Sequence, residues 1–241
     1  KKATLIVKVY SLSQVIEAED AGADIIYYDI FNKDIYQAKK ICKKSKFFLD
    51  TPVILNDNEI ELVTNIIKKV KPDGIVIGNW GLLDINFNGI KHGKYSLNIF
   101  NDISITEINK RNVLPMISVE LNAKQVLDLK NKNIIYFAHG RIPVMHLKGK
   151  YPQMKLKDEK GYTFPLRIIN NNTEMLYSRS IALFEKIKPL LDGGINTFML
   201  DLEKDVTTII KAYKNILNNI KQDTSMLKKG TTIGNYQKGV A

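Results

Sequence analysis

The sequence predicts a single α/β domain built as a (β/α)8 TIM-type barrel. About eight short apolar runs recur along the 241 residues, which is the number of strands that closes such a barrel. The runs are continuous rather than alternating, as in parallel strands that are covered on both faces. Most of them end abruptly on a polar residue, and the strands of a barrel carry their functional residues at that end.

Each apolar run is interpreted as one strand. The strands are expected over residues 3–10, 24–29, 46–55, 73–78, 94–100, 114–120, 133–139 and 195–201. A doubly wound open sheet is the alternative, because periodicity alone does not distinguish a closed sheet from an open one.

Helix-start signals separate most of the strands. Capping-box pairs occur at Ser11 with Gln14, Asn56 with Glu59, Ser104 with Glu107, and Asn122 with Gln125. Apolar residues recur at helical spacing after Asn56 and again after Asp205, so an amphipathic helix is expected at each place. Residues 81–93 are too short and too rich in Gly and Asn for a full helix, and we expect a loop with at most one turn there.

The barrel domain is expected to span residues 1–220. It includes an insertion over residues 141–179, after the seventh strand, which would stand over the catalytic face. Within the insertion, residues 155–168 indicate a β-hairpin whose turn runs from Asp158 to Gly161. Residues 221–241 lack an apolar period and are expected to form a strap on the barrel or a tail. Because the sequence opens on Lys1 rather than Met, we expect a longer natural chain.

Composition narrows the class of protein. Hydrophobic residues make up 44% and charged residues 25% of the chain, which is typical of a globular protein in water. No apolar run reaches the roughly 18 residues of a membrane span, and we expect no membrane partner. Cys42 is the only cysteine, so this chain can form no internal disulfide and cannot hold an iron–sulfur cluster by its own thiolates. A cytoplasmic location is therefore expected.

The chain is basic. Lys and Arg number 36 against 25 Asp and Glu, which gives a formal net charge of +11. Such an excess attracts polyanions, RNA especially. The alternative is that a lysine-rich composition reflects genome bias or a hot habitat and that the charges are merely solvated.

The most informative segment is the end of the seventh strand, where an apolar run stops at His139, Gly140 and Arg141. Arg141 could bind a carboxylate or phosphate, and His139 could act as a general acid or base or as a metal ligand. Glu120 ends the sixth strand and is expected at the same opening. We predict His139, Glu120 and Arg141 as catalytic residues. The alternative is structural, with Arg141 paired to Glu120 and His139 bonded to a backbone carbonyl.

Other polar residues near strand ends are expected to line the same mouth and bind the ligand. They are Lys8, Asn79, Asn98, Asn101 and Asp201. An acid pair that shares a proton is conceivable among Asp29, Asp50 and Asp201 if the barrel brings two of them together.

Signatures of other hydrolases and of metal sites are missing from the sequence. Neither HExxH nor GxSxG occurs, and Cys42 lies in a helical segment where packing is its simplest role. His92 and His146 are expected in loops, without the spacing of a zinc site. We therefore expect no cofactor and no metal held within the chain, while a metal between subunits stays open.

Five motifs resemble a known family. They are NIFND (residues 98–102), SVELNAKQ (118–125), HGRIPVM (139–145), LKDEKGYTFPL (156–166) and TTIGNYQKGV (231–240). In this order they resemble the peptidase family U32, or collagenase-like, domain. The resemblance implies a barrel-type catalytic domain with a peptidase label. Several branches of that family are instead associated with hydroxylation of RNA bases or of a quinone precursor through a cysteine-ligated cluster.

This chain departs from those branches where they supply cysteines. The segment after HGR reads MHLKGKYPQMKLKD, so cluster chemistry does not transfer. The leading hypothesis is a U32-type peptidase domain that binds a peptide-like or small anionic ligand at the mouth, beneath the insertion. The alternatives are an RNA-binding or RNA-modification component without its own cluster, and a noncatalytic homodimer formed through the insertion.

Overall fold

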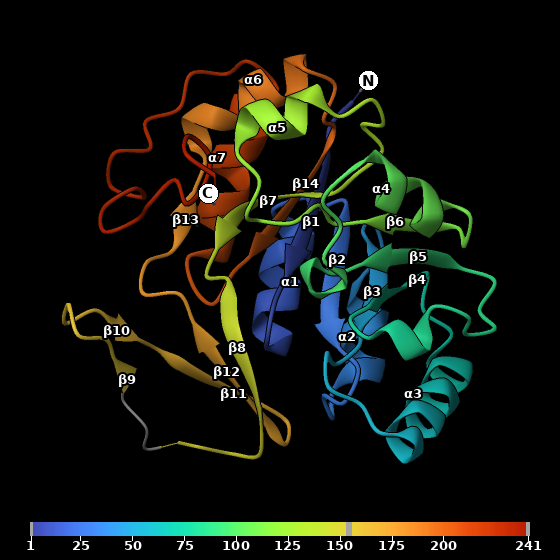
Figure 1. The fold of residues 1–241 in the computed structure, drawn as a ribbon. Helices are drawn as coiled ribbons and strands as arrows, with labels where there is room; N and C mark the ends of the chain where they lie inside the picture. Colours follow the sequence, from blue (N-terminus) through green and yellow to red (C-terminus); the bar gives the residue numbers. More distant parts are fainter. Residues whose placement is uncertain (1, 153–155, 240–241) are drawn as a thin grey trace.

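A curled, mostly parallel sheet of TIM-barrel type forms the centre of the protein (Figure 1). The computed structural model describes residues 2–152 and 156–239. The sheet has nine strands in the order β13-β7-β14-β1-β2-β3-β4-β5-β6. The parallel strands are β1 (Thr4–Lys8), β2 (Ile25–Asp29), β3 (Lys46–Asp50), β4 (Gly74–Ile77), β5 (Ile90–Gly93), β6 (Val113–Pro115), β7 (Tyr136–Gly140) and β14 (Thr197–Asp201). The ninth, β13 (Ile181–Ala182), pairs antiparallel with β7.

Backbone hydrogen bonds link the end of β6 to the start of β7. The Ile135 amide donates to the Pro115 carbonyl at 2.8 Å, and the Ile117 amide donates to the Ile135 carbonyl at 3.0 Å. The curled sheet therefore brings β6 beside β7 without a long ladder between them.

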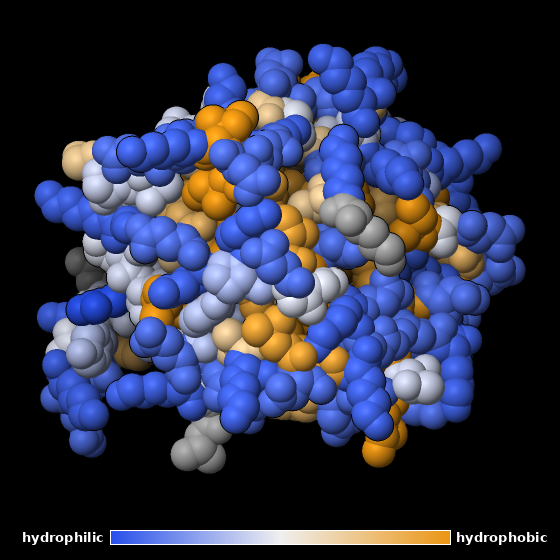
Figure 2. All heavy atoms as spheres, turned by 90° about the horizontal axis from the view of Figure 1, so that it is seen from above, coloured by the Kyte–Doolittle hydropathy of each residue, from blue (hydrophilic) through white to orange (hydrophobic). Residues whose placement is uncertain are grey.

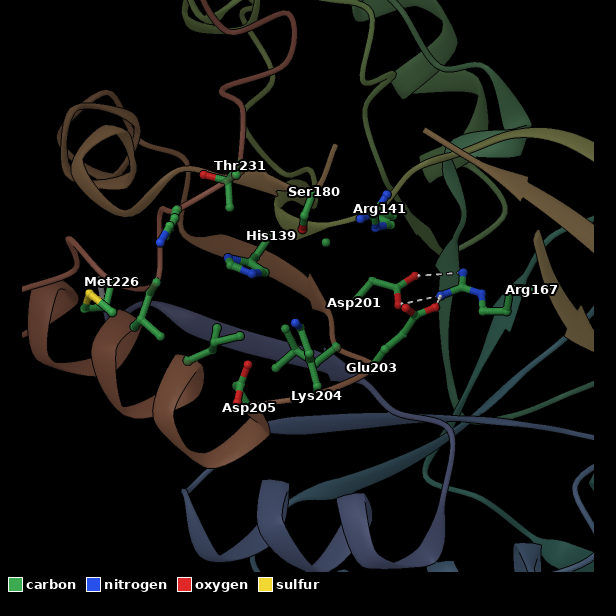
Figure 3. A pocket seen from close by; sticks show the side chains of 16 residues that line it. His139, Arg141, Arg167, Ser180, Asp201, Glu203, Lys204, Asp205, Met226 and Thr231 are labelled. Atoms are coloured by element: carbon green, nitrogen blue, oxygen red, sulfur yellow. Dashed lines mark hydrogen bonds and ion pairs between the residues drawn. The ribbon is translucent and has the colours of Figure 1, made fainter. Parts of the chain in front are cut away.

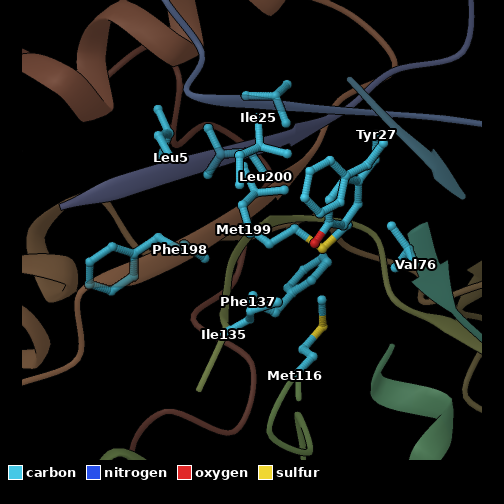
Figure 4. Close-up of a cluster of buried hydrophobic side chains, with 14 of the residues drawn as sticks. Leu5, Ile25, Tyr27, Val76, Met116, Ile135, Phe137, Phe198, Met199 and Leu200 are labelled. Carbon is cyan, nitrogen blue, oxygen red and sulfur yellow. The ribbon is translucent and has the colours of Figure 1, made fainter. Parts of the chain in front are cut away.

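Apolar side chains fill the inside of the curled sheet. Figure 4 shows Met116, Phe137 and Met199 gathered beside Tyr27. All four are buried, with 7% or less of their surface exposed. Burial on this scale is the main source of stability for the domain.

Helices cover the outside of the sheet and begin where capping residues allow. They are α1 (Leu12–Asp20), α2 (Ile35–Ile41), α3 (Asp57–Val70), α4 (Asp102–Asn109), α5 (Ala123–Asp128), α6 (Ile187–Asp192) and α7 (Val206–Leu217). Capping boxes at Ser11, Asn56 and Asn122 open α1, α3 and α5 as predicted. The expected amphipathic helices after Asn56 and Asp205 are α3 and α7.

Two local predictions were wrong. The cap of α4 is Asn101 with Ser104 as its partner, not Ser104 with Glu107, because the amide side chain of Asn101 is already in place to accept from the Ser104 amide at 2.9 Å. The fifth strand lies at residues 90–93, inside the segment expected to be a loop, and Tyr95–Leu97 forms a 3-10 helix instead. Asn98 takes a left-handed conformation (φ 50°), which ends the extended path expected through residues 94–100.

The chain between β7 and β13 forms a second small sheet. It contains β8 (Pro143–Lys148), β11 (Leu166–Ile169) and β12 (Asn172–Leu176), antiparallel in the order β11-β12-β8, and we call it the roof sheet. Figure 1 shows its strands side by side, away from α5 and α6. The short strands β9 (Leu156–Lys157) and β10 (Thr163–Phe164) pair as a hairpin. Residues 153–155 of the predicted insertion lie outside the described residues.

Residues 221–239 run along the outside of the barrel. Thr232 forms a parallel bridge with Ile181, and the Ala123 amide donates to the Tyr236 carbonyl at 2.9 Å. Residues 240 and 241 of the predicted strap lie outside the described residues, as does Lys1 of the predicted domain. Within the described ranges, no helix combines the length and apolar character needed to cross a membrane.

Candidate functional site

Three side chains of the roof sheet face the barrel from one cross-strand row. Arg167 on β11 lies directly opposite Glu174 on β12, and Glu174 lies opposite His146 on β8. Residues paired in this way share a face of the sheet. Because Arg167 contacts a residue at the end of a barrel strand, this face is the one turned to the barrel mouth.

The ends of the barrel strands supply the matching groups, which we call the rim cluster. It consists of Lys8 at the end of β1, Asp50 at the end of β3, Lys94 just after β5, and Asp201 at the end of β14. Lys8 Nζ lies 2.9 Å from Asp50 Oδ2, and Lys94 Nζ lies 2.7 Å from Asp50 Oδ1. Parallel strands bring their carboxyl ends to one edge, which explains why residues far apart in sequence meet here.

Arg167 joins the roof sheet to the rim cluster. Its guanidinium lies 2.7 Å from Glu174. It also lies 3.2 Å from Asp201 and 2.9 Å from Glu203, and Figure 3 shows these two contacts. Tyr10 supports the same carboxylate, since its hydroxyl donates to Asp201 Oδ1 at 2.5 Å. The roof is therefore tied to the mouth by charge-assisted bonds.

Asp50 and Glu174 stay ionised although they are buried, because each has cationic partners. Burial alone would raise the pKa of Asp50, but Lys8 and Lys94 outweigh it and hold that pKa below its usual value. The pKa of Glu174 is likewise lowered, since Lys8 and Arg167 outweigh the effect of burial. Ion pairs this deeply buried seldom add net stability, and they are common where function requires charge.

Tyr95 and His146 form a hydrogen-bonded pair beside these charges. Tyr95 Oη lies 2.9 Å from His146 Nε2, and His146 Nδ1 lies 3.7 Å from Glu174 Oε1. Burial lowers the pKa of His146, which the charge of Glu174 only partly offsets, so the ring is neutral near pH 7. Burial, followed by the negative charge of Glu174, raises the pKa of Tyr95 well above its usual value. A protonated phenol therefore faces a neutral imidazole.

The largest cavity of the mouth opens beside this pair, and we call it the His146 cavity. Its volume is about 450 Å³. Apolar side chains of Val119, Ile142 and Val144 line part of it, while Asn98 and Glu120 add polar groups. Glu120 is exposed to solvent. Apolar walls with a few placed polar groups are typical of a small-molecule site.

A second cavity, of about 240 Å³, lies between the ends of β7 and β14 and the start of α7, and we call it the His139 cavity (Figure 3). His139, Arg141 and Asp201 line it. A bulge in β7 pairs His139 with Leu200, so its ring packs against Phe184 and Tyr213 rather than into the barrel. Burial lowers the pKa of His139 to about 4, with Asp201 opposing this shift.

The three residues predicted as catalytic are divided between the two cavities. His139 and Arg141 share one, and Glu120 lines the other. Arg141 Nη1 donates to the backbone carbonyls of Tyr177 at 3.0 Å and Ser178 at 2.7 Å. Arg141 therefore does not pair with Glu120, contrary to the structural alternative. His139 Nδ1 lies 3.3 Å from the hydroxyl of Tyr213 rather than at a backbone carbonyl.

The predicted ligand residues take several roles. Lys8 and Asp201 belong to the rim cluster, and Asn98 lines the His146 cavity. Asn79 caps a 3-10 helix at Trp80–Leu82 and donates to the Val53 carbonyl at 2.9 Å. Asn101 is the cap of α4. The side-chain amides of Asn79 and Asn101 are therefore both hydrogen-bonded to the backbone.

Two of the three carboxylates considered for a shared-proton acid pair face basic side chains instead. Asp50 faces Lys8 and Lys94, and Asp201 faces Arg167. Asp29 accepts from the Asn170 side chain at 2.7 Å. Asp29 also lies opposite Asp50 in the register of β2 and β3, and burial together with the charge of Asp50 raises the pKa of Asp29. Each of the three carboxylates nevertheless has a donor of its own.

Both histidines expected in loops lie on strands. His146 is on β8, while His92 is on β5, where its Nδ1 lies 2.5 Å from the hydroxyl of Tyr27. Burial lowers the pKa of His92 to about 3 and marks it as a core residue. Cys42 is half-buried, and burial raises its pKa to about 12, as a packing role requires.

Sequence reasoning missed the roof residues of the mouth. They are His146, Arg167 and Glu174, together with Lys94 and Tyr95 just after β5. The alternation Val144, His146, Lys148 indicates one strand face, but no local pattern shows that β8 pairs with β12. In the described residues, no group of three or more His, Cys, Asp or Glu side chains is placed to hold a metal ion.

Comparison with known proteins supports the fold alone. No family model and no curated protein matches the chain. The spore cortex-lytic enzyme SleL of Bacillus cereus matches with a TM-score of 0.51 and 10% identity, over 92% of this chain and 75% of SleL. Thiamine phosphate pyrophosphorylase from Pyrococcus furiosus matches with a TM-score of 0.49 and 14% identity, over 90% of this chain and 96% of its own.

A third solved structure, phosphoribosylanthranilate isomerase from Thermotoga maritima, has a TM-score of 0.48 and 9% identity. The match extends over 90% of this chain and 100% of the isomerase chain. Identities this low carry no information about substrate or reaction. What this chain does must be argued from its own site.

Proposed function

We propose that the protein is a (β/α)8-barrel enzyme whose segment 141–179 roofs the mouth, and that it hydrolyses peptide-like substrates bound in the His146 cavity. The observation that carries this proposal is the contact between Tyr95 and His146 at the wall of that cavity, with Glu174 behind the imidazole. The resemblance of the motifs to the U32 family favours the peptidase class.

The cavity walls suit a peptide. Apolar side chains such as Val119, Ile142 and Val144 can take an uncharged side chain of the substrate. Glu120 is exposed at the same cavity and can pair with a cationic group, for example a peptide amino terminus. Asn98 can hydrogen-bond a peptide group, since it both donates and accepts.

The chemistry we propose uses His146 as a general base. The Tyr95 hydroxyl turns from His146 Nε2 to donate its hydrogen bond to the oxyanion that forms, and the freed Nε2 of neutral His146 takes a proton from water as the water oxygen attacks the carbonyl carbon. The imidazolium then gives its proton to the nitrogen of the leaving amine as the C–N bond breaks. Glu174, kept ionised by Lys8 and Arg167, stabilises the imidazolium between these two steps.

Peptide cleavage tests the proposal directly. A mixture of synthetic peptides is incubated with the full chain, and products are followed by mass spectrometry. His146→Gln and Tyr95→Phe should each slow cleavage by about 100-fold or more. Tyr36→Phe, at an exposed tyrosine on α2, is the matched control and should cleave at the wild-type rate. Absence of cleavage by the wild-type chain, or unchanged cleavage by both site variants, refutes the proposal.

Net charge favours a second candidate function, RNA binding. The chain carries a net charge of +11, and hydrophilic side chains cover most of the face seen in Figure 2. Lys40, Lys43 and Lys44 are exposed together near the end of α2. Binding to a transfer-RNA mixture should weaken steeply between roughly 50 and 200 mM salt, because counterions are released. Weak binding that does not respond to salt excludes this function.

A further inference from the structure

We propose that the His139 cavity is a second ligand site, which binds a small hydroxylated phosphate monoester. The cavity lies apart from the His146 cavity, and the proposal is independent of peptide hydrolysis. It is walled by the ends of β7 and β14, by the first turn of α7, and by residues 226–231 (Figure 3).

The two strand ends meet closely because Gly140 lacks a side chain. Gly140 has a φ of +121°, and a Cβ there would lie 2.4 Å from the Asp201 carbonyl oxygen. This close approach places His139 and Arg141 on either side of the glycine at the cavity wall. A larger residue at position 140 would separate β7 from β14 and open the cavity.

The hydrogen bonds of Tyr213 determine where the proton of His139 lies. Tyr213 Oη donates its one proton to the Ala138 carbonyl at 2.9 Å and accepts from the Leu183 amide at 3.0 Å. His139 Nδ1, 3.3 Å away, must therefore be the donor in its contact with Tyr213. His139 Nε2 then carries no proton and is a hydrogen-bond acceptor.

His139 Nε2 has no hydrogen-bond partner among the described residues, although His139 is only 5% exposed. Figure 3 shows the ring at the cavity, between Ser180 and Lys204. The buried side-chain polar atoms that lack a hydrogen-bond partner in the described residues are Tyr28 Oη and Asp50 Oδ1, so His139 Nε2 is open to the cavity rather than sealed off, and a ligand hydroxyl group that enters the cavity can donate to its lone pair. This indicates a donor group on the ligand.

Positive groups surround the same space. Arg141, Lys204 and Lys229 line the cavity, and the positive end of the α7 dipole points to it. The N-cap of α7, Asp205, makes no side-chain capping bond, so its carboxylate does not cover the amides of the first turn.

Carboxylates also line the cavity, and Asp201 and Glu203 share Arg167. The lining cations still outnumber the lining carboxylates by one: Arg141, Arg167, Lys204 and Lys229 against Asp201, Glu203 and Asp205. This balance of charge favours an anionic ligand, and His139 Nε2 favours a hydroxyl group on that ligand. A hydroxylated phosphate monoester provides both.

Calorimetric titration with two probes tests this site. Glycerol 3-phosphate carries hydroxyl groups and ethyl phosphate does not, and inorganic phosphate serves as the third arm. At low salt the wild-type chain should bind both esters, with glycerol 3-phosphate about tenfold tighter. The double variant Lys204→Ala/Lys229→Ala should weaken both esters by about tenfold or more. Lys40→Ala, on α2, is the matched control and should bind as wild type.

The hydroxyl contact is tested separately. His139→Phe should remove the preference for glycerol 3-phosphate while keeping the binding of ethyl phosphate. If that variant does not fold, the ¹⁵N shift of His139 Nε2 in the wild-type chain gives the same information, because only the hydroxylated ester should move it. No saturable binding at about 10 mM ester, or equal weakening by Lys40→Ala, overturns the site. Binding of inorganic phosphate as tight as that of glycerol 3-phosphate overturns the ester assignment.

Discussion

The His146 and His139 cavities each contain a histidine hydrogen-bonded to a tyrosine, yet the two pairs differ in what the tyrosine does. Tyr213 binds His139, the Ala138 carbonyl and the Leu183 amide with one hydroxyl. Tyr95 contacts His146, and the described hydrogen bonds give its hydroxyl no second partner. The first tyrosine is a structural support, and the second is free to donate its hydrogen bond to the proposed oxyanion.

The two histidines also reach their cavities by different routes. His146 faces the mouth because it lies opposite Glu174 in the regular part of the β8–β12 ladder, before the register shift at Met175 and Leu176. His139 is turned away from the barrel interior by a bulge in β7. A single extra residue in a strand thus decides whether a side chain at a strand end faces the centre of a barrel or its helical layer.

Charged residues of the rim cluster support the His146 cavity, whereas the uncharged hydroxyl of Tyr213 supports the His139 cavity. The largest expected effect tests the rim cluster. Asp50→Ala would leave Lys8 and Lys94 buried without their shared carboxylate, so the free energy of unfolding should fall by about 3–5 kcal/mol. Urea unfolding measures this change. Asp84→Ala, which breaks an exposed pair with Arg111, should change stability by about 1 kcal/mol at most. Equal effects would show that the rim cluster is not a coupled buried unit.

Lowering the pH should destabilise the folded protein through protonation of His139. The pKa of folded His139 is about 4 against an ordinary value of 6.5, so below pH 6.5 the unfolded chain takes up a proton more readily than the folded one. The stability contributed by neutral His139 is complete above pH 6.5 and is lost as the pH falls toward 4. The loss should reach about 3 kcal/mol.

Melting temperatures of the wild-type chain and of His139→Phe between pH 4 and 7 isolate this contribution. The difference between the two should shrink or change sign as the pH falls, because only the wild type carries this titrating group. Parallel pH profiles would contradict the depressed pKa of His139.

The two tyrosines should respond differently to loss of their hydroxyl groups. Tyr213→Phe leaves the Leu183 amide and the Ala138 carbonyl without that partner, which should lower the free energy of unfolding by about 1–3 kcal/mol. Tyr95→Phe removes one hydrogen bond and should cost about 0.5–1.5 kcal/mol while removing the proposed hydrogen bond to the oxyanion. Chemical denaturation of both variants makes the comparison, and a larger loss for Tyr95→Phe reverses our assignment of structural support and oxyanion donor.

The smallest expected effects distinguish Asn98, which lines the His146 cavity, from Asn101, which caps a helix. Asn101→Ala removes the cap of α4 and should lower stability by about 1 kcal/mol, with peptide cleavage unchanged. Asn98→Gly should show the opposite pattern, since Asn98 is exposed at the cavity and glycine accepts its left-handed conformation without strain. Loss of cleavage in Asn101→Ala at full stability would restore Asn101 to the ligand site.

Local sequence signals predicted much of the fold. The buried strands and the caps at Ser11, Asn56 and Asn122 follow from apolar runs and from side chains that bond the backbone within three residues. Lys8 and Asp201 could be placed at the mouth because parallel strands present their ends together. The fifth strand was misplaced because its four residues, IKHG, carry little apolar character of their own.

The sequence by itself determined which segments are buried, where most helices begin, and which polar residues stand at strand ends, since these depend on periodicity and on contacts a few residues apart. Only the tertiary structure decided the site. The meeting of His146, Glu174 and Arg167 with Lys8 and Asp50 depends on the register of β8, β12 and β11 and on the position of the roof sheet. Register between distant segments is set by the packing of the whole domain, which no short stretch of sequence records.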